Sequence, residues 1–106
     1  MASKLERAIA EVRAGTVTDV NLYREYIGDA GATQLADALR TNTNVKELNL
    51  GDNAIGDAGA TQVADALGTN TSVKVLNLDY NPMIGEELKG RIEALLAPAA
   101  RAQRKA

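Results

Sequence analysis

Two spacings of apolar residues alternate along the chain and predict short strands followed by helices. In "VKELNLGDN" the apolar Leu48 and Leu50 alternate with the polar Glu47 and Asn49, which is the two-residue rhythm of a strand with one buried face. From Ala58 on, apolar residues recur at every third or fourth position, as they do on one face of a helix. We therefore expect a strand and then a helix in this part of the chain.

This strand and helix unit occurs three times. Residues 17–44 and 45–72 are identical at 18 of 28 aligned positions, and the pattern starts again at residue 73 with one additional residue after Asn81. Successive strands that are joined by helical crossovers run parallel, and the crossovers are right-handed. A single unit cannot bury its own apolar face without a stacked neighbour. The sequence thus predicts an α/β fold, a short right-handed solenoid with three parallel strands on its concave face and helices on its convex face.

Both ends of the chain have the pattern of a capping helix, which a stacked solenoid needs over its terminal apolar faces. Near the N-terminus Ser3 and Glu6 have capping-box spacing, and Leu5, Ile9 and Val12 form one apolar stripe. Near the C-terminus a second apolar stripe consists of Ile84, Leu88, Ile92, Leu95 and Leu96, and Pro98 marks its end. We expect both helices to cover the ends of the stack.

A length of 106 residues suits a single domain. We expect this domain to span residues 1–97. Its parts are a capping helix in 1–16, repeats in 17–44 and 45–72, and a third repeat with the C-terminal cap in 73–97. The last nine residues, "PAARAQRKA", contain three basic residues and no acidic one, and we expect a disordered basic tail at 98–106.

The repeats resemble a known family. "VKELNLGDNAI" and "VKVLNLDYNPMI" resemble the leucine-rich repeat pattern L-x-x-L-x-L-x-x-N-x-L, and the long unit is similar to the ribonuclease-inhibitor-like class, over residues 17–96. The resemblance implies that Asn53 and Asn81 bond to backbone groups where the chain leaves the strand. An Asn amide suits this role because it both donates and accepts hydrogen bonds. In the first unit Glu25 takes the place of this Asn, a departure from the family pattern.

The two ends resemble a narrower group. "LERAIAEVRAG" leading into "VTDVNL", together with the closing spacing of Ile84, Leu88, Ile92 and Leu95, resembles the repeat domain of the tropomodulin and leiomodin family. This resemblance implies a fold and a style of capping. Proteins of that family bind the pointed end of actin filaments, with a longer repeat domain and a separate N-terminal region that binds tropomyosin and actin. Nothing in this sequence corresponds to that region, so we treat actin as the alternative partner.

The open face of the predicted sheet and the rim beside it supply the candidate binding residues. The outward strand positions are Asp19, Asn21 and Tyr23 in the first unit, Glu47, Asn49 and Gly51 in the second, and Val75, Asn77 and Asp79 in the third. The tyrosines at or just after the strand ends are Tyr23, Tyr26 and Tyr80. One interpretation is a polar, acidic docking strip with a tyrosine rim, since Tyr is favoured at binding hot spots. The other is structural: aligned Asn side chains bond along the ladder, and the tyrosines shield the turns.

Composition argues against several kinds of chemistry. The chain has no His and no Cys, and so lacks the commonest general base, the thiol nucleophile and the best zinc ligands. Three of its twelve basic residues are in the tail, which leaves nine against fourteen acidic residues in 1–97, a poor match for a phosphate backbone. No stretch has the pattern of a signal peptide or a membrane span. We expect a cytoplasmic protein that is not an enzyme and binds no cofactor, metal, nucleic acid or membrane.

The leading functional hypothesis is a non-enzymatic module for protein–protein interaction, or a minimal repeat scaffold of engineered or truncated origin. Its partner is then a protein of unknown identity. One alternative is a tropomodulin-like protein of the cytoskeleton that binds the pointed end of actin filaments. A second alternative, a hydrolase that uses exposed carboxylates, has only the acidic composition in its favour.

Overall fold

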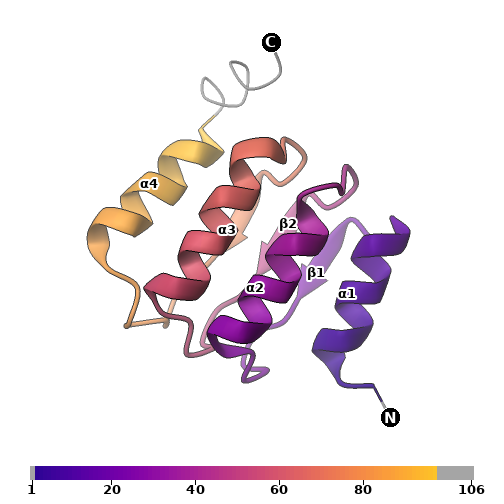
Figure 1. Cartoon of the computed structure of the whole chain (residues 1–106), viewed down its shortest axis with the longest axis horizontal. Coiled ribbons are helices and arrows are strands. Elements are labelled where there is room, and N and C mark those ends of the chain that lie inside the picture. Colours follow the sequence, from indigo (N-terminus) through magenta and orange to yellow (C-terminus); the bar gives the residue numbers. More distant parts are fainter. Residues whose placement is uncertain (1, 98–106) are drawn as a thin grey trace.

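A computed structural model describes residues 2–97, in which four helices alternate with three short strands (Figure 1). The helices are α1 (Lys4–Ala14), α2 (Gly28–Leu39), α3 (Asp57–Thr69) and α4 (Glu86–Leu96), and the strands are β1 (Asp19–Asn21), β2 (Glu47–Asn49) and β3 (Val75–Asn77). The predicted order of elements is therefore confirmed. The predicted basic tail at 98–106, with Pro98, lies outside the described residues.

The strands form one parallel sheet in the order β1-β2-β3. In its register Val20 lies opposite Leu48, and Leu48 lies opposite Leu76, so that equivalent positions of the three repeats are neighbours. The helices lie side by side along one face of the sheet (Figure 1). This arrangement confirms the expected α/β layers and leaves the other face of the sheet open.

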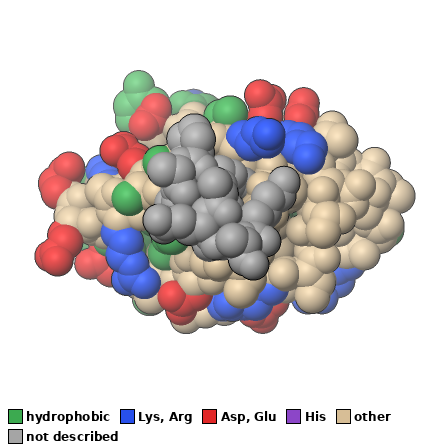
Figure 2. Space-filling model, turned by 90° about the horizontal axis from the view of Figure 1, so that it is seen from above, with side chains coloured by type: hydrophobic (Ala, Val, Ile, Leu, Met, Phe, Trp, Pro, Cys, Tyr) green, Lys and Arg blue, Asp and Glu red, His purple; other side chains and the backbone are tan. Residues whose placement is uncertain are grey.

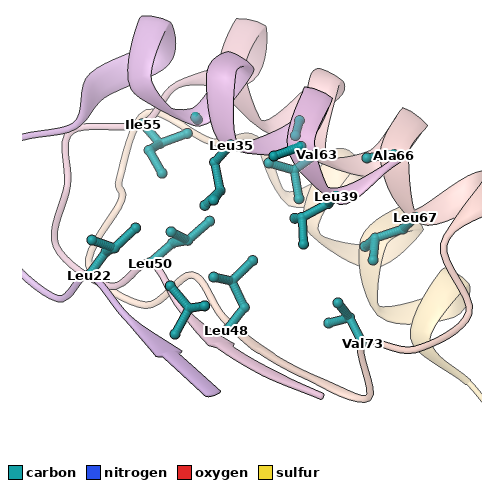
Figure 3. Packing of buried hydrophobic residues seen from close by; sticks show 14 of the residues in the cluster. Leu22, Leu35, Leu39, Leu48, Leu50, Ile55, Val63, Ala66, Leu67 and Val73 are labelled. Atoms are coloured by element: carbon teal, nitrogen blue, oxygen red, sulfur yellow. The ribbon is translucent and has the colours of Figure 1, made fainter. Parts of the chain in front are cut away.

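The core lies between the sheet and the helices. Leu22 and Leu50 point into it from the ends of β1 and β2, Leu35 of α2 lies near them, and Leu67 of α3 lies near Val73 (Figure 3); each of these leucines is at most 1% exposed. Burial of each such side chain contributes about 1.5–3 kcal/mol. The core needs no large aromatic residue, since a leucine from each layer already fills the space between them.

Helices α2 and α3 approach each other closely through small residues. A Cβ atom on Gly59 would lie 3.1 Å from the Cβ of Ala32 and 2.9 Å from the backbone Cα of Asp29. Real Cβ atoms do not make contacts as short as the second of these, so a larger residue at Gly59 would push the two helices apart. The abundance of Ala and Gly in "GDAGATQ" therefore sets the distance between neighbouring repeats.

Helix α1 covers the N-terminal end of the stack. The Ser3 Oγ accepts the Glu6 backbone N–H at 3.0 Å, and the Glu6 carboxylate accepts the Ser3 N–H at 3.0 Å, so the predicted capping box is present. The helix closes on Gly15, whose φ of 71° lies in the left-handed region that glycine adopts readily. Of the predicted stripe Val12 is buried, whereas Leu5 and Ile9 are half-buried.

Helix α4 covers the C-terminal end less completely. It begins at Glu86, so Ile84 precedes the helix instead of belonging to its stripe, although its side chain is buried. In α4 only Ile92 is buried, and Leu88, Leu95 and Leu96 are half-buried. The stripe predicted from the sequence thus packs on the core, but with a larger exposed part than in α2 and α3.

The asparagines at the strand exits join each repeat to the one before it. The Asn53 Oδ1 accepts the Glu25 N–H at 2.8 Å, and its Nδ2 donates to the Leu22 carbonyl at 2.7 Å. Asn81 repeats this pattern on the turn of the second repeat, where its Oδ1 accepts the N–H of Asn53 at 2.9 Å. The predicted bonding to backbone groups is confirmed, and its main target is the preceding repeat.

This direction explains the departure at Glu25. A side chain at this position serves the turn of the preceding repeat, and β1 has no repeat before it. The Glu25 carboxylate instead lies 3.7 Å from the Nζ of Lys4 in the capping helix. An exposed ion pair of this length contributes little to stability. The first repeat therefore lacks the bonds that Asn53 and Asn81 make within their own repeats, but no preceding turn is left without a partner.

Candidate interaction surface

The open face of the sheet carries two rows of side chains at right angles to the strands. One row consists of Asp19, Glu47 and Val75, and the other of Asn21, Asn49 and Asn77. Together they line one shallow groove that crosses all three strands. The structure therefore brings five of the predicted binding residues to one surface: Asp19, Asn21, Glu47, Asn49 and Asn77.

The asparagine row is organised within each repeat. The Oδ1 of Asn21 accepts the Tyr23 N–H at 3.1 Å, that of Asn49 accepts the Gly51 N–H at 3.0 Å, and that of Asn77 accepts the Asp79 N–H at 2.8 Å. Such bonds shape the turn that follows the strand. The expected bonding along the ladder is not observed: within residues 2–97, none of the three Nδ2 groups donates a hydrogen bond to a neighbouring Asn. These amide groups face the groove.

The first row places two carboxylates next to each other. Asp19 and Glu47 are direct cross-strand neighbours, and within residues 2–97 neither forms an ion pair with a Lys or Arg side chain. Like charges on neighbouring strands repel one another. The third member of the row, Val75, is 53% exposed, so the groove has an acidic half and an apolar half.

The tyrosines divide into a pair and a separate residue. Tyr23 and Tyr80 line one hollow at the rim, together with Arg24, Asp52 and Pro82. The Tyr23 ring lies against Gly51, where a Cβ would come within 2.8 Å of the ring carbon Cδ1. Glycine at this position therefore makes room for the ring of the preceding repeat.

Tyr26 does not line that hollow. It has a φ of 55° in the turn before α2 and its side chain is 94% exposed. The idea that all three tyrosines shield the turns does not suit Tyr26, and Tyr80 is also 72% exposed. Tyr23, at 39% exposed, has the smallest exposed part of the three because it packs on Gly51.

An ion pair lies across the rim beside the tyrosine pair. The Arg24 Nε is 3.2 Å from an Asp52 carboxylate oxygen, and these residues occupy equivalent positions of the first and second repeats. Tyr80 occupies the same position in the third repeat. All three have a positive φ, from 53° to 62°, so the backbone at this point directs each side chain outward in the same way. The remaining predicted binding residue, Asp79, comes directly before Tyr80 in the chain, and its side chain is exposed.

The charged groups of the described residues are distributed singly or in pairs. No group of three or more acidic side chains in residues 2–97 is close enough to hold a metal ion. On the face seen in Figure 2, acidic and basic side chains are interspersed around the periphery. Hydrogen bonding from the Ser3 backbone, and next its side chain, holds the pKa of Glu6 below its ordinary value of 4.5, which reflects the helix cap and not a reactive site.

Sequence reasoning missed two further sets of contacts between repeats. The Asp29 carboxylate accepts the N–H of Gly56, and Asp57 accepts that of Gly85, at the start of the next helix in each case. Asn70, which is buried after α3, donates to the carbonyls of Leu39 and Asn42. The signal was present, because Asp29 and Asn42 recur unchanged 28 positions later as Asp57 and Asn70.

Comparisons with known proteins agree with this architecture. A family model described as "Leucine Rich repeat" matches residues 41–64 and 69–87. No curated protein sequence matches the chain. The solved structure of the tropomodulin C-terminal domain from Caenorhabditis elegans aligns with a TM-score of 0.76 and 20% identity, over 94% of this chain and 59% of that chain. Actin-binding site 2 of leiomodin-1 aligns with a TM-score of 0.63 and 19% identity, over 90% of this chain and 73% of that chain.

These likenesses concern the fold. The chain spans 59% of the length of the tropomodulin domain, and similarity at 19–20% identity carries the arrangement of strands and helices but no binding residue. Within residues 2–97, no helix combines the length and the apolar content that crossing a bilayer requires. The fold supports a role as a protein-interaction module. The repeats, the parallel sheet and the terminal helices give the chain a leucine-rich repeat fold, with caps like those of the tropomodulin and leiomodin repeat domains.

Proposed function

We propose that this chain is a non-enzymatic interaction module that binds a protein partner with the open face of its sheet and the adjoining rim. One observation carries the proposal: the large apolar side chains that are exposed in residues 2–97 lie either on the open face or in the turns that follow the strands. They are Tyr23, Tyr26, Val75, Tyr80 and Met83. Val75 is on the open face, and the other four are in the turns between strand and helix. Large apolar side chains that lie exposed near one another are typical of binding surfaces.

The chemistry of this surface favours a partner with basic and apolar groups. Asp19 and Glu47 lie side by side and form no ion pair within residues 2–97, so a Lys or Arg of a partner would relieve their repulsion. The neighbouring Val75 and the hollow of Tyr23 and Tyr80 offer apolar contact. Three short strands at about 4.8 Å spacing give a narrow face, so the rim is needed to reach the area of a specific interface.

The test compares two charge insertions on opposite sides of the molecule. Asn49→Arg places a cation in the middle of the groove, and Gln34→Arg places the same cation on an exposed position of α2. Proteins captured from a cell lysate with each variant and with the unchanged chain are identified by mass spectrometry. We expect a common partner that Gln34→Arg retains and Asn49→Arg loses, while both variants keep the melting temperature. Equal capture of that partner by both variants would exclude the open face as the binding surface.

A second candidate function is tropomodulin-like binding to the pointed end of actin filaments in the cytoplasm. It is favoured by the alignment with actin-binding site 2 of leiomodin-1 over 90% of this chain. The assay is elongation of actin filaments from free pointed ends in the presence of the chain. Inhibition at micromolar protein that Asn49→Arg abolishes and Gln34→Arg preserves would identify actin as the partner. We expect no inhibition by the chain alone, because its open face is small for a stable complex.

A further inference from the structure

The outer edge of β3 lacks a neighbour that the two preceding strands have. The Leu22 N–H donates to the Asn49 carbonyl at 2.9 Å, and the Leu50 N–H donates to the Asn77 carbonyl at 2.8 Å. Leu78 holds the same place in the third repeat. Since β3 ends the sheet order, no following strand within residues 2–97 offers a carbonyl to the Leu78 N–H.

A second series of backbone bonds stops at the same edge. The Arg24 N–H donates to the Gly51 carbonyl at 3.1 Å, and the Asp52 N–H donates to the Asp79 carbonyl at 2.8 Å. Tyr80 comes next in this series, and it has no following strand in the described part of the chain. The edge therefore presents two donors in the spacing at which the earlier repeats bind a parallel strand.

An acceptor completes the set. The Thr18 carbonyl accepts the Lys46 N–H at 2.7 Å, and the Lys46 carbonyl accepts the Lys74 N–H at 2.8 Å. The Lys74 carbonyl is the next in line. The fold therefore specifies the direction and register of an added strand. It runs parallel to β3, and its donors and acceptors take the positions that those of β2 take beside β1 and those of β3 take beside β2.

Side-chain burial also shows that this edge is less covered than the interior of the sheet. Leu48 is 2% and Leu50 is 0% exposed, whereas the equivalent Leu76 and Leu78 are only half-buried. The opposite edge is different, because Val20 in β1 is 7% exposed beside the capping helix. An apolar side chain from an added strand would therefore complete the core at the β3 edge.

The position of α4 decides what can fill this edge. α4 lies beside α3, at the end of the stack where the sheet ends with β3 (Figure 1). If two copies paired through their β3 edges, both α4 helices would lie over one seam. Strands are about 4.8 Å apart but packed helices need about 8–10 Å, so the two helices would collide. A single extended segment that carries no helix there avoids this collision.

We propose that the outer edge of β3 binds an extended segment of a protein partner, which adds to the sheet as a fourth parallel strand. Backbone hydrogen bonds to Leu78, Tyr80 and Lys74 hold the segment, and its alternate apolar side chains cover Leu76 and Leu78. The segment has the alternation of apolar and polar residues seen in β2. This edge adjoins the open face at β3 and Tyr80, but it binds through backbone groups that the function proposed above does not use, so the two proposals are tested separately.

The probe is a synthetic fluorescent peptide with the sequence of residues 45–53, "VKELNLGDN", which is the segment that follows β1 in the same register. Two N-methylated versions provide the matched comparison. In the fold the backbone of Asn49 faces the preceding strand, β1, because its carbonyl accepts the Leu22 N–H. In the complex the strand that precedes the peptide is β3, so methylation at the position of Asn49 blocks an amide that would face β3. Methylation at the position of Leu50 blocks an amide on the opposite side, since the Leu50 N–H donates to Asn77 in β3.

We expect the unmodified peptide and the Leu50-methylated peptide to bind the full chain equally, and the Asn49-methylated peptide to bind at least about tenfold more weakly. In NMR spectra of the chain, the amide signals of Leu76, Leu78 and Tyr80 should shift and exchange more slowly with solvent. Equal binding of the two methylated peptides, no binding at millimolar peptide, or shifts at β1 instead would overturn the proposal. Shifts at β3 that depend on protein concentration alone would also overturn it, because a second copy would then occupy the edge.

Discussion

The carboxylate of Asp29 caps the helix of the next repeat, where it accepts the backbone N–H of Gly56 at 2.7 Å. The same oxygen accepts the Gly59 N–H at 2.9 Å. Gly56 is the N-cap residue of α3 and has no side chain with which to cap its own helix. Two N–H groups at the start of α3, those of Gly56 and Gly59, are therefore satisfied by a carboxylate from α2, which also suits the positive end of the helix dipole.

We predict that Asp29→Ala destabilises the chain by about 1–2 kcal/mol, the usual cost of removing a helix cap. Asp37→Ala removes an exposed carboxylate of the same helix that takes part only in a surface ion pair, and it should cost less than about 0.5 kcal/mol. Urea unfolding of both variants measures the difference. Equal midpoints would mean that the contact between Asp29 and Gly56 does not stabilise the fold.

Asn53→Ala should be more costly than a change on the open face. The Asn53 side chain is 1% exposed and bonds to backbone groups of Leu22, Glu25 and Gly51. Its loss leaves several buried groups without a partner, at about 1–3 kcal/mol for each. Asn49→Ala removes one bond to a turn and should cost less than about 1 kcal/mol. The two variants are compared by chemical unfolding, and a larger loss for Asn49→Ala would contradict the assignment of faces.

Truncation of equivalent leucines should reveal the difference between the interior and the C-terminal end. Leu50 is fully buried, whereas Leu78 is half-buried. We expect Leu50→Ala to cost about 2–5 kcal/mol and Leu78→Ala about half as much, because a partly exposed site leaves a smaller cavity. Thermal and denaturant unfolding provide both values. A greater loss at Leu78 would show that the β3 edge is already sealed.

The N-terminal cap should respond to acid through Glu6. The pKa of this carboxyl is lowered in the folded chain, first by hydrogen bonding to the Ser3 backbone. A lowered folded pKa means that the stabilisation is present above the unfolded value near 4.5 and is lost as the pH falls through the folded value. The carboxyl pKa of Glu6 is measured by NMR titration in the unchanged chain and in Ser3→Ala. We expect only a partial rise of the pKa in the variant, because it loses the hydrogen bond from the Ser3 side chain and keeps the one from the backbone N–H. No change would argue against the capping box.

Much of the fold could be predicted from the sequence, because the two spacings of apolar residues survive in each repeat. The alternation of Glu47, Leu48 and Asn49 marked β2 and the orientation of its faces, and the near identity of the first two repeats fixed the parallel register. Local patterns of this kind are read directly from residue type. The strands proved shorter than the pattern, since Tyr23, Gly51 and Asp79 lie beyond their ends.

The contacts between repeats were harder to predict. The sequence marked Asn53 as a turn residue, but not that its bonds reach the preceding repeat. Likewise Asp29 has the appearance of an ordinary acidic residue in the first turn of α2, and its role depends on how closely α3 approaches. Which tyrosines share a hollow was undetermined for the same reason, because the path of each turn and the space at Gly51 decide it.

The contacts that cross from one repeat to the next make the length of this solenoid adjustable in whole units. Asp29 reaches forward to the second repeat, and Asn53 reaches back to the first. At the following junction Asp57 and Asn81 play the same parts. If a copy of residues 45–72 were inserted before residue 73, each of its two junctions would therefore have the Asp of the earlier repeat and the Asn of the later repeat that these contacts require. Such an insertion should lengthen the stack and raise its stability, since in repeat proteins each added interface contributes its own increment of free energy.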